Sequence, residues 1–220
     1  MNPHQVTIEF EKEIAKYTGA RYAIAVDNCS NALFLALMYD NIKGKTIGIP
    51  CRTYMSVPCE IIHAGGFVSF LPVTGETLKG AYHLIGSDVI DSALHFTADM
   101  YIPGTYMCCS FTGPYKHLKL GKGGCILTDN PNANIWFRRA RYSGRREVSY
   151  HVDTFDSLGW NFYMNPIVAE MGLLLMKQFY TIDGKKLNMP DIELPYPDLS
   201  QFSIYVAKFY EEDNFHLIQT

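Results

Sequence analysis

The chain has 220 residues, of which 48% are hydrophobic and 19% charged, as in a globular protein with a substantial core. Its formal net charge of −3 argues against a protein whose main partner is a nucleic acid. No apolar run in the sequence is long enough to span a membrane. The N-terminal stretch lacks the charged-then-apolar pattern of a secretion signal, so we expect a cytoplasmic protein.

The cysteines and histidines are spread along the chain. The six cysteines form no CxxC pair, and the seven histidines show no metal-binding spacing such as HExxH. Several of the cysteines lie in apolar runs. We therefore expect reduced, buried thiols, with neither disulfides nor a metal site.

The first third of the chain alternates between predicted helices and strands. Apolar residues recur on one face of an amphipathic helix from Val6 to Thr18. The continuous apolar run YAIAV, from Tyr22 to Val26, predicts a buried strand. The polar turn DNCSN then leads into an apolar helix that Asn28 or Ser30 can cap. Such a turn can bind a phosphate group, but taken alone it favours a plain helix cap.

The next elements are shorter. The pattern predicts a strand over Thr46 to Pro50, a helix over Ser56 to Ala64, a strand over Phe67 to Val73, an irregular polar stretch over Thr74 to Ser87, and a strand over Val89 to Asp91. The last strand ends in an acid, at the position where α/β enzymes place ligand contacts. An ordinary turn or cap is the alternative interpretation.

The stretch around Lys116 consists of two apolar runs with a cationic turn between them. Met107 to Phe111 and Gly123 to Thr128 predict strands, and the segment from Thr112 to Lys122 is dense in Gly, Pro, Lys and His. A lysine in such a turn can be a nucleophile toward a carbonyl group, an anion clamp or a solvated residue. Taken alone, the turn favours the solvated lysine.

The second half of the chain supplies two further helical segments. Five arginines between Asn132 and Arg146 indicate a solvated helix face rather than a nucleic-acid patch. Asn165 and Pro166 can start a helix, and Ile167 to Phe179 is apolar on most sides, which predicts burial in a core or an interface. The alternation of strands and helices predicts an α/β fold with a largely parallel sheet.

On this frame, six pieces of the sequence resemble, in order, the motifs of the DegT/DnrJ/EryC1/StrS family of sugar aminotransferases. They are FEKEIAKYTGARYAIAV, DNCSNAL, PCRTY, VIDSALH, SFTGPYKHLKLGKGGCILTD and GWNFYMNPIVAEMGL. The resemblance implies a type I aminotransferase-like fold, a mostly parallel sheet sandwiched by helices, that binds pyridoxal 5′-phosphate (PLP). It further implies that residues 1–180 form an abridged PLP-binding domain and residues 181–220 a remnant of the small C-terminal domain.

The resemblance also implies roles for individual residues. Lys116 falls on the family lysine that bonds covalently to PLP and later moves a proton between substrate and cofactor. The other cofactor contacts fall on Ser30, Asn31 and Ser110 at the phosphate, on Tyr54 stacked against the pyridine ring, and on Asn161 reaching the phosphate of a neighbouring subunit. A core tyrosine is the alternative for Tyr54, and a turn asparagine is the alternative for Asn161.

Direct alignment puts Ser92 where the family has the acid that pairs with the pyridine nitrogen. Asp91 precedes it, and successive residues of a regular strand face opposite sides. We expect a bulge or strand end to bring Asp91 to the nitrogen, with His95 packed against the ring oxygen. The stretch from Phe70 to Val89 is too short for the additional strand and helix that the family has there.

The implied reaction is transfer of an amino group from an amino acid, glutamate in our expectation, to a keto-sugar nucleotide by a homodimer with shared active sites. A PLP-dependent sugar dehydratase would carry histidine in place of Lys116. The alternative from another class is a degenerate relative that acts as a non-catalytic or PLP-binding-only assembly protein, and a nucleic-acid binder ranks third.

Overall fold

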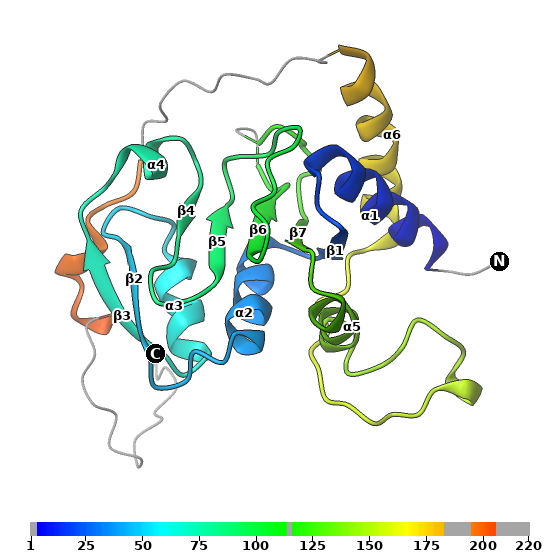
Figure 1. The fold of residues 1–220 in the computed structure, drawn as a ribbon, viewed down its shortest axis with the longest axis horizontal. Helices are drawn as coiled ribbons and strands as arrows, with labels where there is room; N and C mark the ends of the chain where they lie inside the picture. The colour runs from blue at the N-terminus through cyan, green and yellow to red at the C-terminus, as the bar shows by residue number, and fades with distance from the viewer. Residues whose placement is uncertain (1–3, 114–115, 183–194, 206–220) are drawn as a thin grey trace, which may run out of the picture.

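The computed structural model describes residues 4–113, 116–182 and 195–205, in which helices lie on both sides of a central sheet (Figure 1). The helices are α1 (Gln5–Thr18), α2 (Cys29–Tyr39), α3 (Ser56–His63), α4 (Gly75–Leu78), α5 (Pro131–Ala140) and α6 (Pro166–Ile182). The strands are β1 (Tyr22–Val26), β2 (Thr46–Pro50), β3 (Phe67–Leu71), β4 (Tyr82–His83), β5 (Val89–Ser92), β6 (Tyr106–Ser110) and β7 (Gly124–Thr128).

The strands lie side by side in one continuous spatial order. Five of them are hydrogen-bonded in the order β1-β7-β6-β5-β4, and β2 pairs with β3. Gly48 of β2 and Ile85, just beyond β4, join the two groups, with N···O distances of 2.8 and 2.9 Å between their backbone groups. The order across the fold is therefore β3-β2-β4-β5-β6-β7-β1.

The predicted α/β fold is confirmed, and the structure shows that its sheet is mixed. Strands β1, β2, β3, β5 and β6 run in one direction, while β4 and β7 run opposite to their neighbours. Antiparallel neighbours need only a short connection, whereas parallel neighbours need a crossover. The short chain between Phe70 and Val89 therefore enters the sheet as the turn-linked strand β4, in the stretch predicted to be irregular.

Alternation along the strands buries both faces of the sheet. Ile24 and Val26 of β1 pack with α2, α3 and α5, whereas Ala23 and Ala25 pack with α1 and α6. Small residues on the second face let its helices approach closely. A Cβ at Gly172 of α6 would lie 2.5 Å from the ring of Phe10 on α1, so this glycine permits the contact between the two helices.

The arginines in and after α5 do not form the predicted solvated face. The side chain of Arg141 is fully buried, with Glu11 of α1 2% exposed beside it. Arg141 donates hydrogen bonds to Glu11, to the carbonyl oxygen of Ala25 and, at 2.6 Å, to Glu147 Oε1. Arg138 lies 2.8 Å from the second oxygen of Glu11. The prediction was wrong because Arg141 follows the last turn of α5 and enters the core instead of extending the exposed face.

Other predictions concern the termini of elements and the cysteines. Asn28, not Ser30, caps α2, because its Oδ1 accepts a 2.8 Å hydrogen bond from the backbone N–H of Asn31. All six cysteines are free thiols, and they are buried at Cys29, Cys108, Cys109 and Cys125. No helix in the described part of the chain is both long and apolar enough to cross a membrane.

Most of the predicted C-terminal remnant lies outside the described residues. Residues 195–205 pack against the region that follows β2. The backbone N–H of Leu199 donates to the carbonyl oxygen of Cys51 at 2.7 Å, and Arg52 donates to the carbonyl oxygen of Tyr196 at 3.0 Å. This segment therefore borders the carboxyl end of β2.

Candidate active site

A cavity of about 540 Å³ opens at the carboxyl ends of β5 and β6, beside the N-terminus of α2. Crevices of this kind are where open α/β sheets bind ligands. Six of the predicted site residues line the cavity, and they come from separate parts of the sequence: Ser30, Asn31, Tyr54, Asp91, Ser110 and Lys116. Cys29, Ser56, Thr112 and Tyr196 are among the lining residues that the sequence did not single out.

The N-terminus of α2 forms the polar end of the cavity. Ser30 Oγ lies 2.6 Å from Ser56 Oγ of α3, and the side-chain amide of Asn31 donates to Asp27 at 2.7 Å. Ser110 and Thr112 add hydroxyl groups from the end of β6. A helix N-terminus with several hydroxyl groups nearby suits an anionic group such as a phosphate.

Lys116 supplies the only cationic side chain among the described residues that line the cavity. Its Nζ donates a 2.7 Å hydrogen bond to the carbonyl oxygen of Ala93. Burial lowers the pKa of the Lys116 ammonium, although the nearby Cys29 and Asp91 oppose this shift. A lowered pKa makes more of the neutral amine available at a given pH, and the neutral amine is the nucleophilic form.

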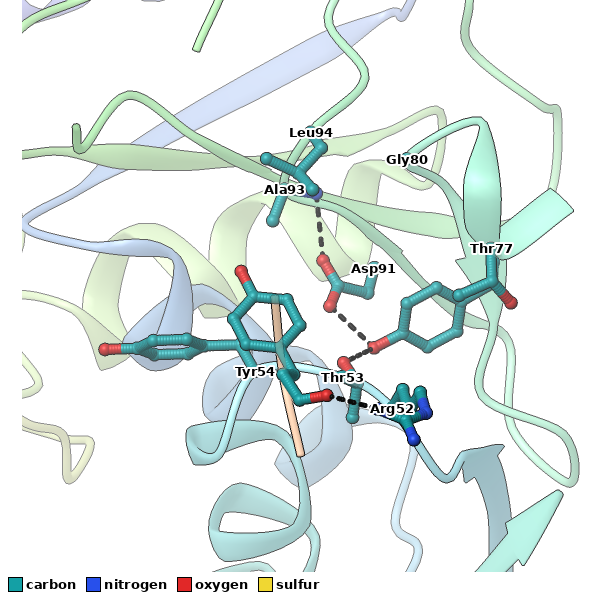
Figure 2. Close-up of a pocket in the computed structure, with 10 residues that line it drawn as sticks. Arg52, Thr53, Tyr54, Thr77, Gly80, Asp91, Ala93 and Leu94 are labelled. Atoms are coloured by element: carbon teal, nitrogen blue, oxygen red, sulfur yellow. Dashed lines mark hydrogen bonds between the residues drawn. The ribbon is translucent and has the colours of Figure 1, made fainter. Parts of the chain in front are cut away.

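Asp91 faces the same cavity and is 4% exposed. Its Oδ1 accepts a 2.9 Å bond from the backbone N–H of Ala93, and its Oδ2 accepts a 2.8 Å bond from the hydroxyl of Tyr82 (Figure 2). Burial raises the pKa of the Asp91 carboxyl, while these two hydrogen bonds and the charge of Lys116 oppose the shift. The site therefore holds one buried acid and one half-buried amine.

The structure corrects the expected path of β5. The strand has no bulge and pairs with β6 up to Ser92, yet Asp91 points toward the cavity. Ser92 faces the opposite side and is 1% exposed, and its Oγ has no hydrogen-bond partner among the described residues. Asp91 and not Ser92 therefore lines the cavity, and its pairing with the ring nitrogen remains a prediction.

Two further predicted residues lie away from the lining of the cavity. His95 comes after the turn that follows β5, and its Nε2 lies 3.3 Å from Thr97 Oγ1. It is not among the residues that line the cavity, and its contact with the ring oxygen of the cofactor remains a prediction. Asn161 is exposed and pairs with Tyr142 through an isolated bridge. Its contact with a neighbouring subunit remains a prediction.

Two tyrosines stand at the cavity from different parts of the chain. Tyr54 is 50% exposed, which excludes the core-tyrosine alternative. Its ring centroid is 5.9 Å from that of Tyr196, in an edge-on arrangement. Tyr196 was missed because it lies in a Pro-rich stretch with no periodic pattern, and only the packing of residues 195–205 brings it here.

The fold places the chain in the structural class of the aminotransferases. It superposes on the sugar aminotransferase CalS13 from Micromonospora echinospora with a TM-score of 0.64, at 16% identity, over 80% of this chain and 61% of that one. A DegT DnrJ EryC1 StrS aminotransferase from Brucella abortus gives a TM-score of 0.64, at 20% identity, over 79% of this chain and 58% of that one. The shared feature is the fold.

The sequence profile of the DegT/DnrJ/EryC1/StrS aminotransferase family matches residues 4–92 and 103–190. The chain therefore belongs to this family, as its motifs predicted. It is also 39% identical over 72 residues to the spore coat polysaccharide biosynthesis protein SpsC of Bacillus subtilis (strain 168), covering 32% of this chain and 18% of SpsC. The chain spans about three fifths of the length of the solved structures it matches.

Proposed function

We propose that this chain binds PLP in the cavity, with Lys116 as the lysine that bonds to it, and transfers an amino group from an amino acid to a keto-sugar nucleotide. The observation that carries the proposal is that one half-buried amine, Lys116, and one buried carboxylate, Asp91, line the same cavity. The family membership supports the cofactor class. The names of CalS13 and SpsC support a sugar as the substrate.

The residues of the cavity fit PLP chemically. The hydroxyl groups of Ser30, Ser56, Ser110 and Thr112 and the N-terminus of α2 would hold the phosphate. The volume of about 540 Å³ is in the range of small-molecule sites. When bound, PLP withdraws electrons from the carbon that carries the amino group, so that its proton can be moved.

The side chains have separate tasks in this proposal. Asp91 would pair with the ring nitrogen, because an opposite charge within hydrogen-bonding distance favours the protonated ring. Lys116 would accept and return the substrate proton, for which its lowered pKa is suited. Tyr54 and Tyr196 would cover the ring on the solvent side. Because Tyr196 lines the cavity, we also propose that residues 181–220, as a remnant of the small C-terminal domain, contribute to the site formed by residues 1–180.

The second candidate is a relative that binds PLP without rapid turnover. It is supported by the exposure of the cavity lining, since Tyr54 is 50% exposed and Thr112 is exposed as well. A bound cofactor that is open to water is under weaker electrostatic control during a reaction. Fast turnover of a keto-sugar nucleotide with glutamate would reject this candidate.

The cofactor proposal is tested by trapping. The purified protein is incubated with PLP, reduced with borohydride and digested, and the pyridoxyl group is located by mass spectrometry. We expect the adduct on Lys116 and its loss in Lys116→Ala. Lys119→Ala, which removes an exposed lysine of the same loop, is the matched control and should keep the adduct. An adduct on Lys119 or Lys122, or none under saturating PLP, would show that the assignment is wrong.

We further propose that the active unit is a homodimer that contains Asn161 at its interface. Apolar side chains on α6 are exposed, with Ile167 at 71%, Met171 at 49% and Leu174 at 58%. An obligate interface commonly buries more than about 2,000 Å² and is rich in such residues. Leu174→Glu is expected to convert a dimer into a monomer in sedimentation experiments, whereas Ile135→Glu on α5, at an equally exposed site of 58%, should not. A wild-type monomer at micromolar concentration would contradict the proposal.

A further inference from the structure

The Asp91 carboxylate is held by a hydrogen-bond chain that comes from outside the cavity. Tyr82 of β4 lies directly opposite Asp91 of β5 in the antiparallel pair, so the two side chains share a face. The Tyr82 hydroxyl is 2.8 Å from Asp91 Oδ2 and 2.5 Å from the hydroxyl of Thr53 (Figure 2). All three side chains are buried, with exposures of 4% for Asp91, 9% for Tyr82 and 4% for Thr53.

The number of hydroxyl protons determines which group donates and which accepts in this hydrogen-bond chain. An ionised carboxylate can only accept, so the single hydroxyl proton of Tyr82 must point to Asp91. Thr53 must then donate its own proton to the oxygen of Tyr82. The two hydroxyl groups are thus aligned to stabilise a negative charge on Asp91, and their hydrogen bonds favour the ionised carboxyl over the neutral one.

The arrangement also leaves room for a further donor. A carboxylate offers about four lone-pair positions. Tyr82 occupies one on Oδ2, and the backbone N–H of Ala93 occupies one on Oδ1. A ring nitrogen carrying a proton can therefore still bind the carboxylate from the cavity side.

We propose that Tyr82, supported by Thr53, is a positioning residue that keeps Asp91 ionised and aimed at the ring nitrogen of the cofactor. This inference rests on the PLP site proposed above and deepens it. Tyr82 belongs to the reversed strand β4, in a stretch that carries no family motif. The strand that fills the gap in the sheet thus also supplies a hydrogen bond to the reactive centre.

The Tyr82 hydrogen bond matters because few of the groups around Asp91 favour its ionised form. The titratable groups that face it are Lys116 on the loop after β6, Cys29 of α2, Cys108 of β6, Tyr82 of β4 and Tyr196. Only Lys116 among them carries a positive charge. Burial alone raises the pKa of the Asp91 carboxyl, and the Tyr82 hydrogen bond opposes that rise.

The test begins with the protein free of PLP. The pH titration of the Asp91 carboxyl carbon is followed by NMR in ¹³C-aspartate-labelled full-length chain, with Asp91→Asn to assign the signal. We expect Tyr82→Phe to move the titration to higher pH. Tyr106→Phe is the matched control, because Tyr106 is also 9% exposed but lies opposite Val89 of β5 and not opposite Asp91, and it should leave the titration unchanged. Equal titrations in the wild type and Tyr82→Phe would overturn the inference.

A second variant and a second measurement keep the test decisive. Thr53→Val keeps the phenol of Tyr82 and should move the titration of Asp91 in the same direction by a smaller amount. This variant can replace Tyr82→Phe in the test if Tyr82→Phe fails to fold.

In PLP titrations followed by visible absorbance, Tyr82→Phe should weaken the binding of PLP about tenfold relative to Tyr106→Phe, which is the cost of one hydrogen bond to a charged group. An unchanged affinity in Tyr82→Phe would count against the role. If the wild type binds no PLP, the cofactor proposal fails while the NMR titration still decides whether Tyr82 controls Asp91.

Discussion

Replacing Arg141 by methionine is expected to lower the free energy of unfolding by about 3–5 kcal/mol, the usual cost of breaking a buried ion pair from one side. The substitution keeps a long apolar side chain but removes the hydrogen bonds to Glu11, Ala25 and Glu147. Glu11 would then keep a buried negative charge with Arg138 as its remaining ion-pair partner among the described residues. Urea denaturation followed by circular dichroism measures the change.

A matched variant separates this network from ordinary surface pairs. Arg139→Met removes an ion pair with Asp156, whose side chain is 54% exposed, and should cost less than about 1 kcal/mol. The loss in Arg141→Met should also depend on pH. Burial tends to raise the pKa of Glu147, but the guanidinium groups of Arg141 and Arg138 lower it overall. The stabilisation is therefore present above the ordinary pKa of 4.5 and lost as the pH falls through the lower value of the folded protein. Equal losses of unfolding free energy in both variants would show that the buried network of Arg141 contributes no more than a surface ion pair.

Replacing Asp91 by asparagine is expected to slow the reaction of bound PLP with glutamate by roughly 100-fold or more, as when another preorganised charge is removed from a reactive centre. Asparagine keeps the shape and the bond from Ala93 but cannot hold a protonated ring nitrogen. The change in visible absorbance under single-turnover conditions measures the rate. The affinity for PLP, measured by titrating the protein with PLP, should fall as well.

Ser92→Asp is the complementary variant. Because Ser92 faces away from the cavity and is 1% exposed, a carboxylate there would be buried without a partner. We expect a loss of stability of a few kcal/mol and no gain in rate. Ser92→Ala is the control and should be nearly neutral, since the Ser92 hydroxyl has no hydrogen-bond partner to lose within residues 4–113, 116–182 and 195–205. If Asp91→Asn left affinity and rate untouched while Ser92→Asp raised the rate, Asp91 would not be the acid and the protein would be a degenerate aminotransferase.

The sequence predicted the parts of this molecule that depend on local pattern. The strand YAIAV, the caps at Asn28 and Asn165 and the apolar runs around Lys116 each signal their structure within a few residues. The ends of those elements lie at one edge of the sheet, so several lining residues of the cavity could be predicted as well. Motifs of the family extended this to Tyr54 and Ser110.

What the sequence could not predict depends on residues that meet only in space. A one-residue error in register exchanges the two faces of a strand, and no local signal distinguishes Asp91 from Ser92. Tyr82 and Tyr196 come from stretches without periodicity, so their contacts with Asp91 and Tyr54 were hidden. Arg141 looks like its neighbouring arginines until the partner Glu11, far earlier in the chain, is brought beside it.

The position of β1 has a consequence for how the chain is made. β1 pairs along its whole length with β7, and α1 packs against α6, so both early elements depend on segments from the second half of the chain. During synthesis, Tyr22–Val26 leaves the ribosome long before Gly124–Thr128 exists. The nascent protein therefore carries an unpaired strand and the uncovered apolar face of α1, surfaces that invite association with other chains. Synthesis of β7 and then of α6 covers them in turn, so the early elements acquire their native contacts late in synthesis.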